Sequence, residues 1–129
     1  MAIMVKVGDV RTYTTTVTEA GLAAFHGETV HPVYATFALA RDSEWTSRLF
    51  VLDMRQADEE GIGTFLSIEH KAPAFVGEEI TFVAKVLKIR GKELICSVVA
   101  KVGNKTVAEG TTGQRLLRRE RLAEIMKGN

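Results

Sequence analysis

The chain of 129 residues has a single cysteine, Cys96, and few histidines. One cysteine excludes a disulfide within the chain and every zinc motif built on cysteine. The three histidines do not occur in an HxxxH or HxH spacing, so we expect no metal site. Cys96 alternates with Leu94 and Val98, and this pattern predicts a small buried side chain rather than a nucleophile.

The sequence also lacks an excess of charge of either sign and any long apolar run. Lysine and arginine number 17 against 16 acidic residues, whereas a nucleic-acid-binding module normally carries a basic excess on one face. No apolar run approaches the roughly 18 to 20 residues that a membrane span needs. The start, MAIMVKVGD, has neither the hydrophobic core nor the cleavage site of a secretory signal. We therefore expect a cytoplasmic protein that binds neither nucleic acid nor membrane.

Proline is scarce as well, and one of the two prolines marks the stretch around which the chain is organised. Residues 31–54, HPVYATFALARDSEWTSRLFVLDM, contain no glycine, and Pro32 lies at their start, where a helix tolerates proline best. Side chains at steps of three and four predict a helix with one buried stripe, which comprises Tyr34, Phe37 or Ala38, Arg41, Trp45, Leu49 and Leu52. We interpret Trp45 and the phenylalanines as core residues.

The rest of the chain has the pattern of a strand-rich domain. Alternation of apolar residues predicts strands at 7–18, 63–70, 80–89, 94–102 and 105–117. Two helical turns are expected at 19–25, a charged loop at 55–61, and a short amphipathic helix in the tail after residue 117. The length fits one domain, 1–129. A long helix and antiparallel hairpins bury their apolar faces against each other, so we predict an α+β fold whose sheet wraps one helix and dimerises past an exposed edge.

Four residues occur where packing alone would not put them. Thr36 and Glu44 lie on the predicted helix, about 80° apart around its axis and about 12 Å apart along it. His70 ends the strand that begins with Gly63, and a glycine in a strand lets another group approach the backbone closely.

Each of these residues also has an ordinary structural explanation. A threonine in a helix often bonds a backbone carbonyl, and a histidine at a strand end is commonly a surface residue. Gly63 could mark a β-bulge. A glutamate in the middle of a helix is usually a solvated residue, and Glu44 could also pair with Arg41 or Arg48.

At these positions the sequence resembles the hot-dog-fold thioesterases related to fluoroacetyl-CoA thioesterase. The resemblance rests on VHPVYAT at 30–36, on Glu44 with Trp45, on GIGT at 61–64 and on Glu69 with His70. It extends from about residue 7 to residue 117, although the hairpins after residue 77 match only the general layout of the fold. The resemblance implies a hot-dog fold and a homodimer, or a tetramer of such dimers, with two sites at the subunit interface.

The resemblance also implies roles for individual residues. Thr36, Glu44 and His70 match the family's catalytic threonine, glutamate and histidine. Gly63 matches the glycine whose backbone N–H contacts the substrate carbonyl. Further candidates for contact with the substrate are two residues at the predicted helix start and two at the position of the family's C-terminal arginine: His31, Tyr34, Gln114 and Arg115.

Two departures from the family pattern limit these implications. Direct counting places Gln114 where the family has its arginine, and Arg115 is the neighbouring residue. The phenylalanine-rich segment of the fluoroacetyl enzyme is not reproduced in HGETVHPV at 26–33, so fluoroacetyl specificity is not implied.

These residue types suit the hydrolysis of a thioester. The reaction needs a nucleophile or an activated water, a base, and hydrogen-bond donors for the developing oxyanion. Histidine side chains titrate near neutrality, so His70 is the natural base. Glu44 would orient His70 or act directly as base or nucleophile, and Thr36 would attack the thioester or position a water. The N–H of Gly63 would bind the oxyanion.

We therefore expect an acyl-CoA thioesterase for a small or medium acyl group, with coenzyme A as part of the substrate and no separate cofactor. One alternative is a protein of the same fold that binds acyl-CoA or an acyl carrier without catalysis. A weaker alternative is an enoyl-CoA hydratase, because hydratases of this fold carry an Asp/His motif that is absent here. Basic residues at 88–92 and 115–121 are candidates for binding the phosphates of coenzyme A, or are simply solvated.

Overall fold

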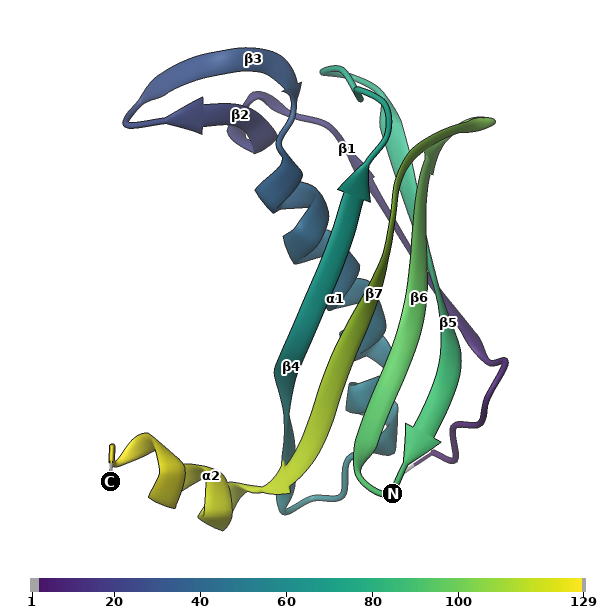
Figure 1. The fold of residues 1–129 in the computed structure, drawn as a ribbon, viewed down its shortest axis with the longest axis vertical. Coiled ribbons are helices and arrows are strands. Elements are labelled where there is room, and N and C mark those ends of the chain that lie inside the picture. Colours follow the sequence, from purple (N-terminus) through teal and green to yellow (C-terminus); the bar gives the residue numbers. More distant parts are fainter. Residues whose placement is uncertain (1–2, 129) are drawn as a thin grey trace.

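The computed structural model describes residues 3–128 and shows one long helix beside an antiparallel sheet (Figure 1). The elements are β1 (Val10–Thr16), a 3-10 turn η1 (Glu19–Gly21), β2 (Leu22–Phe25), β3 (Glu28–Tyr34), α1 (Thr36–Met54), β4 (Glu59–His70), β5 (Glu79–Arg90), β6 (Glu93–Val102), β7 (Lys105–Arg118) and α2 (Arg119–Met126). The predicted α+β fold, with a sheet around one long helix, is confirmed. Within residues 3–128, no helix has the length and apolar character needed to cross a membrane.

The main sheet has the strand order β1-β5-β6-β7-β4, so β1 and β4 form its two edges. Every neighbouring pair is antiparallel, and α1 packs on one face of the sheet. The side chains that β5 and β6 bury are those that the two-residue alternation predicts: Ile80, Phe82, Ala84, Val86, Leu94, Cys96, Val98 and Ala100. The prediction that Cys96 is a small buried residue is therefore confirmed.

The long helix begins at Thr36, so the predicted start at His31 is wrong. Residues 31–34 belong instead to β3, which pairs with β2 in a separate two-stranded ribbon. Pro32 accounts for this difference. A proline drives the preceding residue into an extended conformation, and a ribbon strand tolerates its missing N–H.

The same ribbon overturns the prediction of two helical turns at 19–25. Only Glu19–Gly21 forms a single 3-10 turn, and Leu22–Phe25 forms β2. His26 and Gly27 make the turn of the ribbon with φ of 53° and 83°, which is the left-handed region that glycine favours. The segment therefore pairs with its neighbour in sequence instead of coiling.

The buried face of α1 also differs from the predicted stripe. Trp45 is 41% exposed and Phe37 is 52% exposed, so their assignment to the core is wrong. The same assignment is wrong for Phe25, Phe65 and Phe75, which are also exposed. The residues that α1 buries are mainly small or polar: Ala38, Leu39, Asp42, Ser43, Thr46, Ser47, Phe50 and Val51. Small side chains let the helix lie close to the sheet, and Thr112 of β7 donates a hydrogen bond of 2.6 Å to Ser47 Oγ. Phe50 and Phe82 are core residues as predicted.

The start of the strand that carries Gly63 and His70 also differs from the prediction. β4 begins at Glu59 rather than at Gly63, and a bulge interrupts its pairing with β7 between Gly63 and Phe65. The predicted tail helix is present as α2. Figure 1 shows the β2–β3 ribbon and α2 at opposite ends of the molecule, both extending to the same side beyond the β4 edge.

Candidate functional site

The side chains of Thr36 and His70 meet where α1 begins and β4 ends. Thr36 Oγ1 lies 3.0 Å from His70 Nδ1, although the two residues are 34 positions apart in the sequence. The other ring nitrogen of His70, Nε2, is buried and has no hydrogen-bond partner within residues 3–128. A hydroxyl bonded to an imidazole is an arrangement in which the imidazole can accept the proton of a nucleophile.

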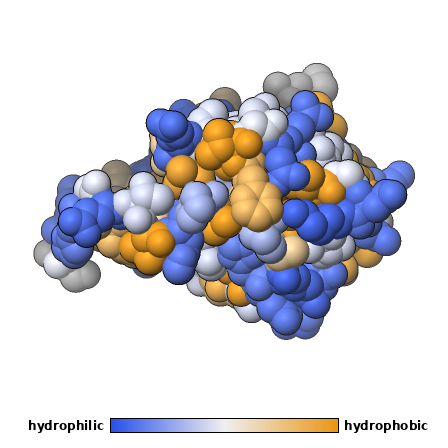
Figure 2. Space-filling view, turned by 90° about the horizontal axis from the view of Figure 1, so that it is seen from above, coloured by the Kyte–Doolittle hydropathy of each residue, from blue (hydrophilic) through white to orange (hydrophobic). Residues whose placement is uncertain are grey.

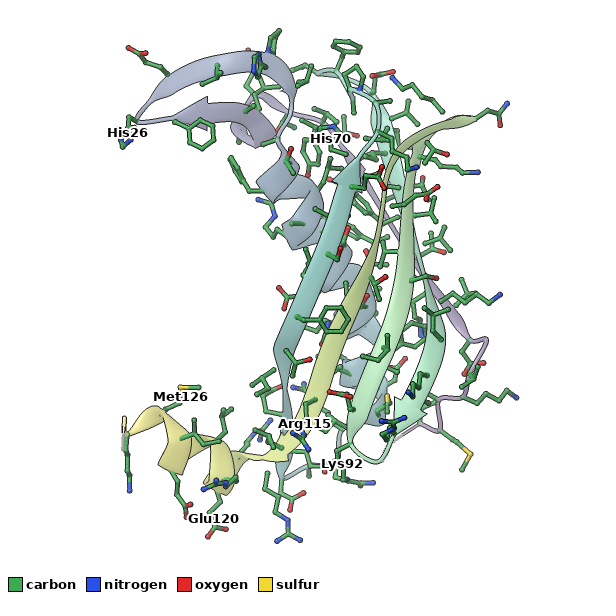
Figure 3. The ribbon with its side chains drawn as sticks, viewed as in Figure 1. His26, His70, Lys92, Arg115, Glu120 and Met126 are labelled. Carbon is green, nitrogen blue, oxygen red and sulfur yellow. The ribbon has the colours of Figure 1, made fainter. Side chains whose placement is uncertain are left out.

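This pair lies at the end of the molecule that carries the β2–β3 ribbon. Figure 3 shows His70 near the upper end of β4 and His26 at the far tip of the ribbon. Viewed from above, this end exposes apolar surface between hydrophilic atoms (Figure 2). The ribbon and the loop after His70 contribute exposed apolar side chains, namely Phe25, Val30, Phe75 and Val76.

A second pair, Glu44 and Gly63, lies farther along α1 and β4. A Cβ atom on residue 63 would overlap Oε1 of Glu44, so the absence of a side chain lets the carboxylate approach the β4 backbone. Within the described chain, Glu44 forms no ion pair with Arg41 or Arg48. Arg41 pairs with Asp42 and Arg48 with Glu60, so the ordinary ion-pair explanation for Glu44 is wrong.

Gln114 lies next to Glu44 and Gly63, whereas Arg115 lies on the other face of β7. Gln114 lies opposite Gly63 in the β4–β7 register, is 2% exposed, and donates from Nε2 to the backbone carbonyl of Glu44 at 3.1 Å. Arg115 is exposed on the other face of β7, opposite Ile62 and Glu93. Figure 3 shows Arg115 near the lower end of the molecule beside Lys92, far from His70.

The other two candidates near the helix start do not present free groups to Thr36 and His70. Tyr34 is 3% exposed, and its hydroxyl donates to the carboxylate of Asp42. His31 is exposed on β3, opposite Ala23. Asp42 was not among the sequence candidates. Asp42 lies eight positions after Tyr34, on the side of α1 that faces the sheet. A charged residue at such a position was the signal that could have identified it.

The basic residues near the β4 start are largely engaged by acids. Glu60 accepts hydrogen bonds from the side chains of Arg48 and Arg55, and Arg119 lies within 3.8 Å. The Gly61 N–H, together with these arginines, lowers the pKa of Glu60 to about 2. Lys92, a candidate for binding phosphate, pairs with Glu59 instead. Within residues 3–128, no group of three or more His, Cys, Asp or Glu side chains is placed to hold a metal ion.

The two pairs are too far apart in one chain to act on one thioester. Thr36 and Glu44 are eight residues apart on α1, which corresponds to about 12 Å of helix. Gly63 and His70 are seven residues apart on β4, which corresponds to roughly 23 Å of strand. One chain therefore holds the four candidate residues as two separate pairs rather than as one assembled set.

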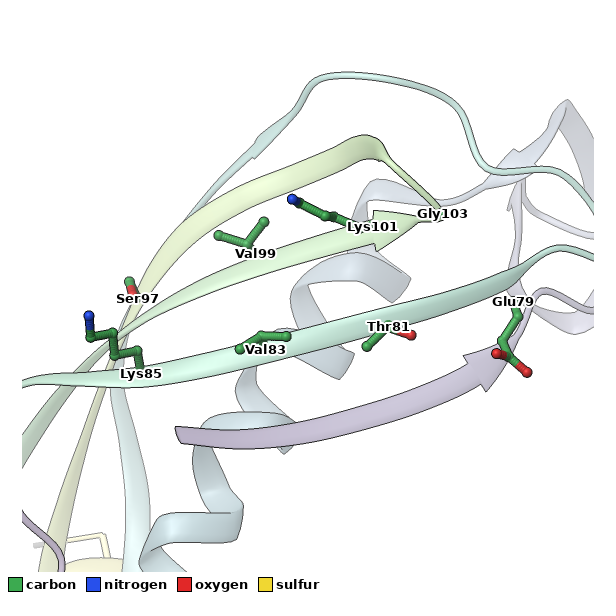
Figure 4. Close-up of a pocket in the computed structure, with 8 residues that line it drawn as sticks. All are labelled: Glu79, Thr81, Val83, Lys85, Ser97, Val99, Lys101 and Gly103. Atoms are coloured by element: carbon green, nitrogen blue, oxygen red, sulfur yellow. The ribbon is translucent and has the colours of Figure 1, made fainter. Parts of the chain in front are cut away.

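One surface depression of the described chain lies away from both pairs of residues. It has a volume of about 620 Å³ and lies on the face of the sheet that points away from α1 (Figure 4). Its walls come from β5 and β6: Glu79, Thr81, Val83, Lys85, Ser97, Val99, Lys101 and Gly103. A smaller depression of about 280 Å³ includes His70 beside Val33 and Pro73. The residues that line the larger depression include no histidine, whereas the smaller depression includes the imidazole that bonds Thr36.

A family model and several solved structures resemble this chain. The model described as FlK, fluoroacetyl-CoA-specific thioesterase, matches residues 17–120. Among curated proteins, none matches the chain.

The solved structures share the whole fold. A hypothetical protein of Thermus thermophilus, described as a thioesterase superfamily member, is 27% identical with a TM-score of 0.91, over 95% of this chain and 90% of that one. The fluoroacetyl-CoA thioesterase FlK is 20% identical with a TM-score of 0.88, over 98% of this chain and 99% of that one. A hot-dog-like protein of Thermanaerovibrio acidaminovorans is 18% identical with a TM-score of 0.86, over 93% and 89%. The fold expected from the resemblance is confirmed.

Proposed function

Since the chain belongs to the fluoroacetyl-CoA-specific thioesterase family, we propose that it hydrolyses the thioester of a small or medium acyl-CoA. The observation that carries this proposal is the bond between Thr36 Oγ1 and His70 Nδ1, at 3.0 Å. Variants of FlK bind acetyl-CoA in one structure and fluoroacetate with CoA in another. We do not extend the proposal to fluoroacetyl specificity, because residues 26–33 contain no phenylalanine.

In the proposed reaction, His70 takes a proton from the Thr36 hydroxyl or from a water that Thr36 holds. The deprotonated oxygen attacks the thioester carbon, and the carbonyl oxygen gains the negative charge. The N–H of Gly63 stabilises this oxyanion. The C–S bond then breaks, and the coenzyme A thiolate takes the proton from the imidazolium of His70. When water is the attacking group, the free acid is formed in this step. When Thr36 attacks, the acyl group is left as an ester on Oγ1; a water that gives its proton to His70 then attacks this ester, and the proton returns to Thr36 Oγ1 as the acid leaves. Glu44 stabilises the cationic form of His70 through its negative charge.

This reaction needs all four groups at one thioester, and we propose that a homodimer brings them together. β4 is an edge strand, so its outer backbone groups are free to pair with another strand. Two β4 strands paired antiparallel about a two-fold axis between Leu66 and Ser67 would place His70 of one chain opposite Gly63 of the other. Each site would then take Thr36 and His70 from one chain, and Glu44 and Gly63 from the second.

Exposed apolar side chains support this dimer. Phe37 and Trp45 lie eight residues apart on α1 and are 52% and 41% exposed, and Phe65 on β4 is 47% exposed. The cores of protein interfaces are rich in aromatic residues, and these three exposed aromatic side chains lie on the helix and the edge strand that a second subunit would approach. A subunit that covers the β4 edge would bury this surface.

A thiol-release assay tests the proposal. The purified protein is incubated with short, branched, aromatic and long acyl-CoAs, beside the variants Thr36→Val, Glu44→Gln and His70→Gln. The control is His26→Asn, which changes an exposed histidine in a turn where asparagine tolerates the φ of 53°. We expect turnover by the wild type and the control, and a fall of roughly 10²- to 10⁴-fold in the His70 variant.

The same assay separates the alternatives. Binding of acyl-CoA in a calorimeter without thiol release would indicate a non-catalytic acyl-CoA protein. Conversion of an enoyl-CoA without thiol release would indicate a hydratase. Neither turnover nor binding across the panel would overturn the proposed substrate class.

A further inference from the structure

The inner face of α1 carries a charged cluster that the proposed reaction does not use. The hydroxyl of Tyr34 donates to Oδ2 of Asp42, and Arg41 Nε donates to Oδ1 of Asp42 at 3.1 Å. Arg41 Nη2 also reaches the Tyr34 hydroxyl at 3.3 Å. The side chain of Asp42 is 7% exposed and that of Arg41 is 64% exposed, so the guanidinium covers the buried acid from the solvent side.

Stability alone does not explain this cluster. Removing a carboxylate from water is unfavourable, and a well-packed apolar pair of similar size is commonly as stable as a buried ionic group. Burial raises the pKa of Tyr34 above its usual range, which keeps the phenol protonated as a donor to Asp42. The cluster therefore fixes a geometry between the residues that it joins.

Tyr34 joins the two elements that carry Thr36 and His70. Its backbone N–H donates to the carbonyl of Ala74 at 2.8 Å, in the loop that follows His70. Its side chain bonds Asp42 on α1, the helix that begins with Thr36. A single residue thus ties the segment after His70 to the helix that presents the Thr36 hydroxyl.

The start of α1 has no cap of its own. Ala35 is at the N-cap position and makes no side-chain hydrogen bond to the first turn, and that turn contains no acidic residue. An uncapped first turn tends to fray because its N–H groups have no partners. The Ala35 N–H bonds the Gly21 carbonyl at 2.9 Å, and a Cβ on Gly21 would overlap the Tyr34 ring. The helix start is therefore held from outside, by the 3-10 turn and by Tyr34.

We propose that Tyr34 and Asp42 are positioning residues, whose mutual hydrogen bond holds the Thr36 hydroxyl against Nδ1 of His70. Neither residue touches the substrate. Arg41 shields the bond from water. This role for Tyr34 replaces the substrate contact expected from the sequence. The proposal rests on the proposed function for its effect on turnover, but the bond it concerns can be observed without any substrate.

The test measures the His70 imidazole directly by ¹⁵N NMR. The three histidines are few enough to assign, and the signals lost in His70→Gln identify those of His70. Thr36→Val gives the reference for a broken Thr36–His70 bond. We expect Tyr34→Phe and Asp42→Asn to move the His70 nitrogen signals towards that reference. The matched control is Tyr13→Phe, which removes the other tyrosine hydroxyl of the chain, on β1, and should leave the signals in place.

Turnover gives the second readout. Tyr34→Phe should lower kcat about tenfold or more with little change in KM, because the Thr36 hydroxyl is misplaced while substrate binding is not. His70 signals that stay at the wild-type position in folded Tyr34→Phe and Asp42→Asn would overturn the proposal and leave the cluster a purely structural role. Displaced signals in a protein that hydrolyses no acyl-CoA would support the positioning role and overturn the thioesterase function instead.

Discussion

Gln114 fastens the backbone of Glu44 from across the sheet. The two residues are 70 positions apart, and the amide Nε2 of Gln114 donates a hydrogen bond of 3.1 Å to the Glu44 carbonyl oxygen. Gln114 also lies opposite Gly63 on the neighbouring strand. One position of β7 therefore bonds the α1 backbone at Glu44 and lies opposite the glycine that the Glu44 carboxylate approaches. Where the family resemblance expects an arginine, this chain has a neutral amide engaged with its own backbone.

Because Glu44 lies so close to Gly63, adding one methyl group at residue 63 should have a large effect on activity. Gly63→Ala should displace the Glu44 carboxylate, because the new Cβ would occupy the space of Oε1. We expect kcat to fall by roughly 10²- to 10³-fold, the loss typical of a disturbed oxyanion site. The melting temperature should change little, since Glu44 and Gly63 are both exposed. Ser97→Ala on β6, away from the β4 edge, is the control, and equal activity of the two variants would contradict the prediction.

The sequence was a good guide wherever the decisive pattern was local. The alternation of Ile80, Phe82, Ala84 and Val86 identifies a strand and its buried face without reference to other elements, because side chains alternate across a strand. The end of α1 at Met54 also agrees with the predicted end of the long helix.

Burial on α1 could not be read in the same way. Hydrophobicity placed Trp45 in the core, yet Ser43 and Ser47 are buried and Trp45 is not. Which side of a helix faces a sheet depends on how closely the two can approach, and that depends on residues far away such as Thr112. The pairing of Thr36 with His70 was likewise visible only as a family resemblance, because nothing in a spacing of 34 residues fixes a contact.

The proposed shared sites predict complementation between inactive chains. Thr36→Ala and Glu44→Gln should each be inactive alone, because every site of either homodimer lacks one group. When the two variants are expressed together, the resulting population of dimers should have roughly a quarter of the wild-type activity. Half of randomly formed dimers are mixed, and each mixed dimer has one intact site of two.

The control for this experiment combines two variants whose altered groups come from the same chain at each proposed site. Thr36→Ala mixed with His70→Gln should recover no activity, because both groups come from the same chain and each mixed dimer has a defect in both sites. Recovery in this control, or none in the first mixture, would contradict the shared site.

The carboxylate of Glu60 predicts how stability depends on pH. Its pKa is lowered from 4.5 to about 2 in the folded chain by the Gly61 N–H and by Arg48 and Arg55. A lowered pKa stabilises the fold at pH values above 4.5, and this contribution is lost as the pH falls towards 2. Glu60→Gln should therefore lower the melting temperature at pH 7, and the difference from the wild type should vanish near pH 2.

The control for this prediction is Glu120→Gln, which alters an exposed carboxylate on α2. Thermal unfolding from pH 7 to pH 2 measures both variants. A difference between wild type and Glu60→Gln that stays constant over this range would show that Glu60 does not act through its charge.

The buried thiol of Cys96 predicts low reactivity. Burial raises the pKa of Cys96 to about 11, so at pH 8 only roughly one thiol in a thousand is ionised. A disulfide reagent that counts thiols should therefore find almost none in the native protein and one per chain in guanidinium chloride. Fast reaction of the native protein would contradict this burial. The prediction also means that the thiol-release assay measures coenzyme A without interference from the protein.

The small residues on the inner side of α1 determine how closely the helix approaches the sheet, and this separation affects residues that they do not touch. Ser43 and Ser47 are 1% and 0% exposed, and Ser47 Oγ accepts a hydrogen bond from Thr112 of β7. Glu44 is joined directly to Ser43, whereas Gly63 belongs to the sheet. Any enlargement at Ser43 or Ser47 would lift the helix and widen the gap between carboxylate and glycine without altering either residue. Substitutions in the protein core can thus change the distance between the Glu44 carboxylate and Gly63 while both residues stay the same.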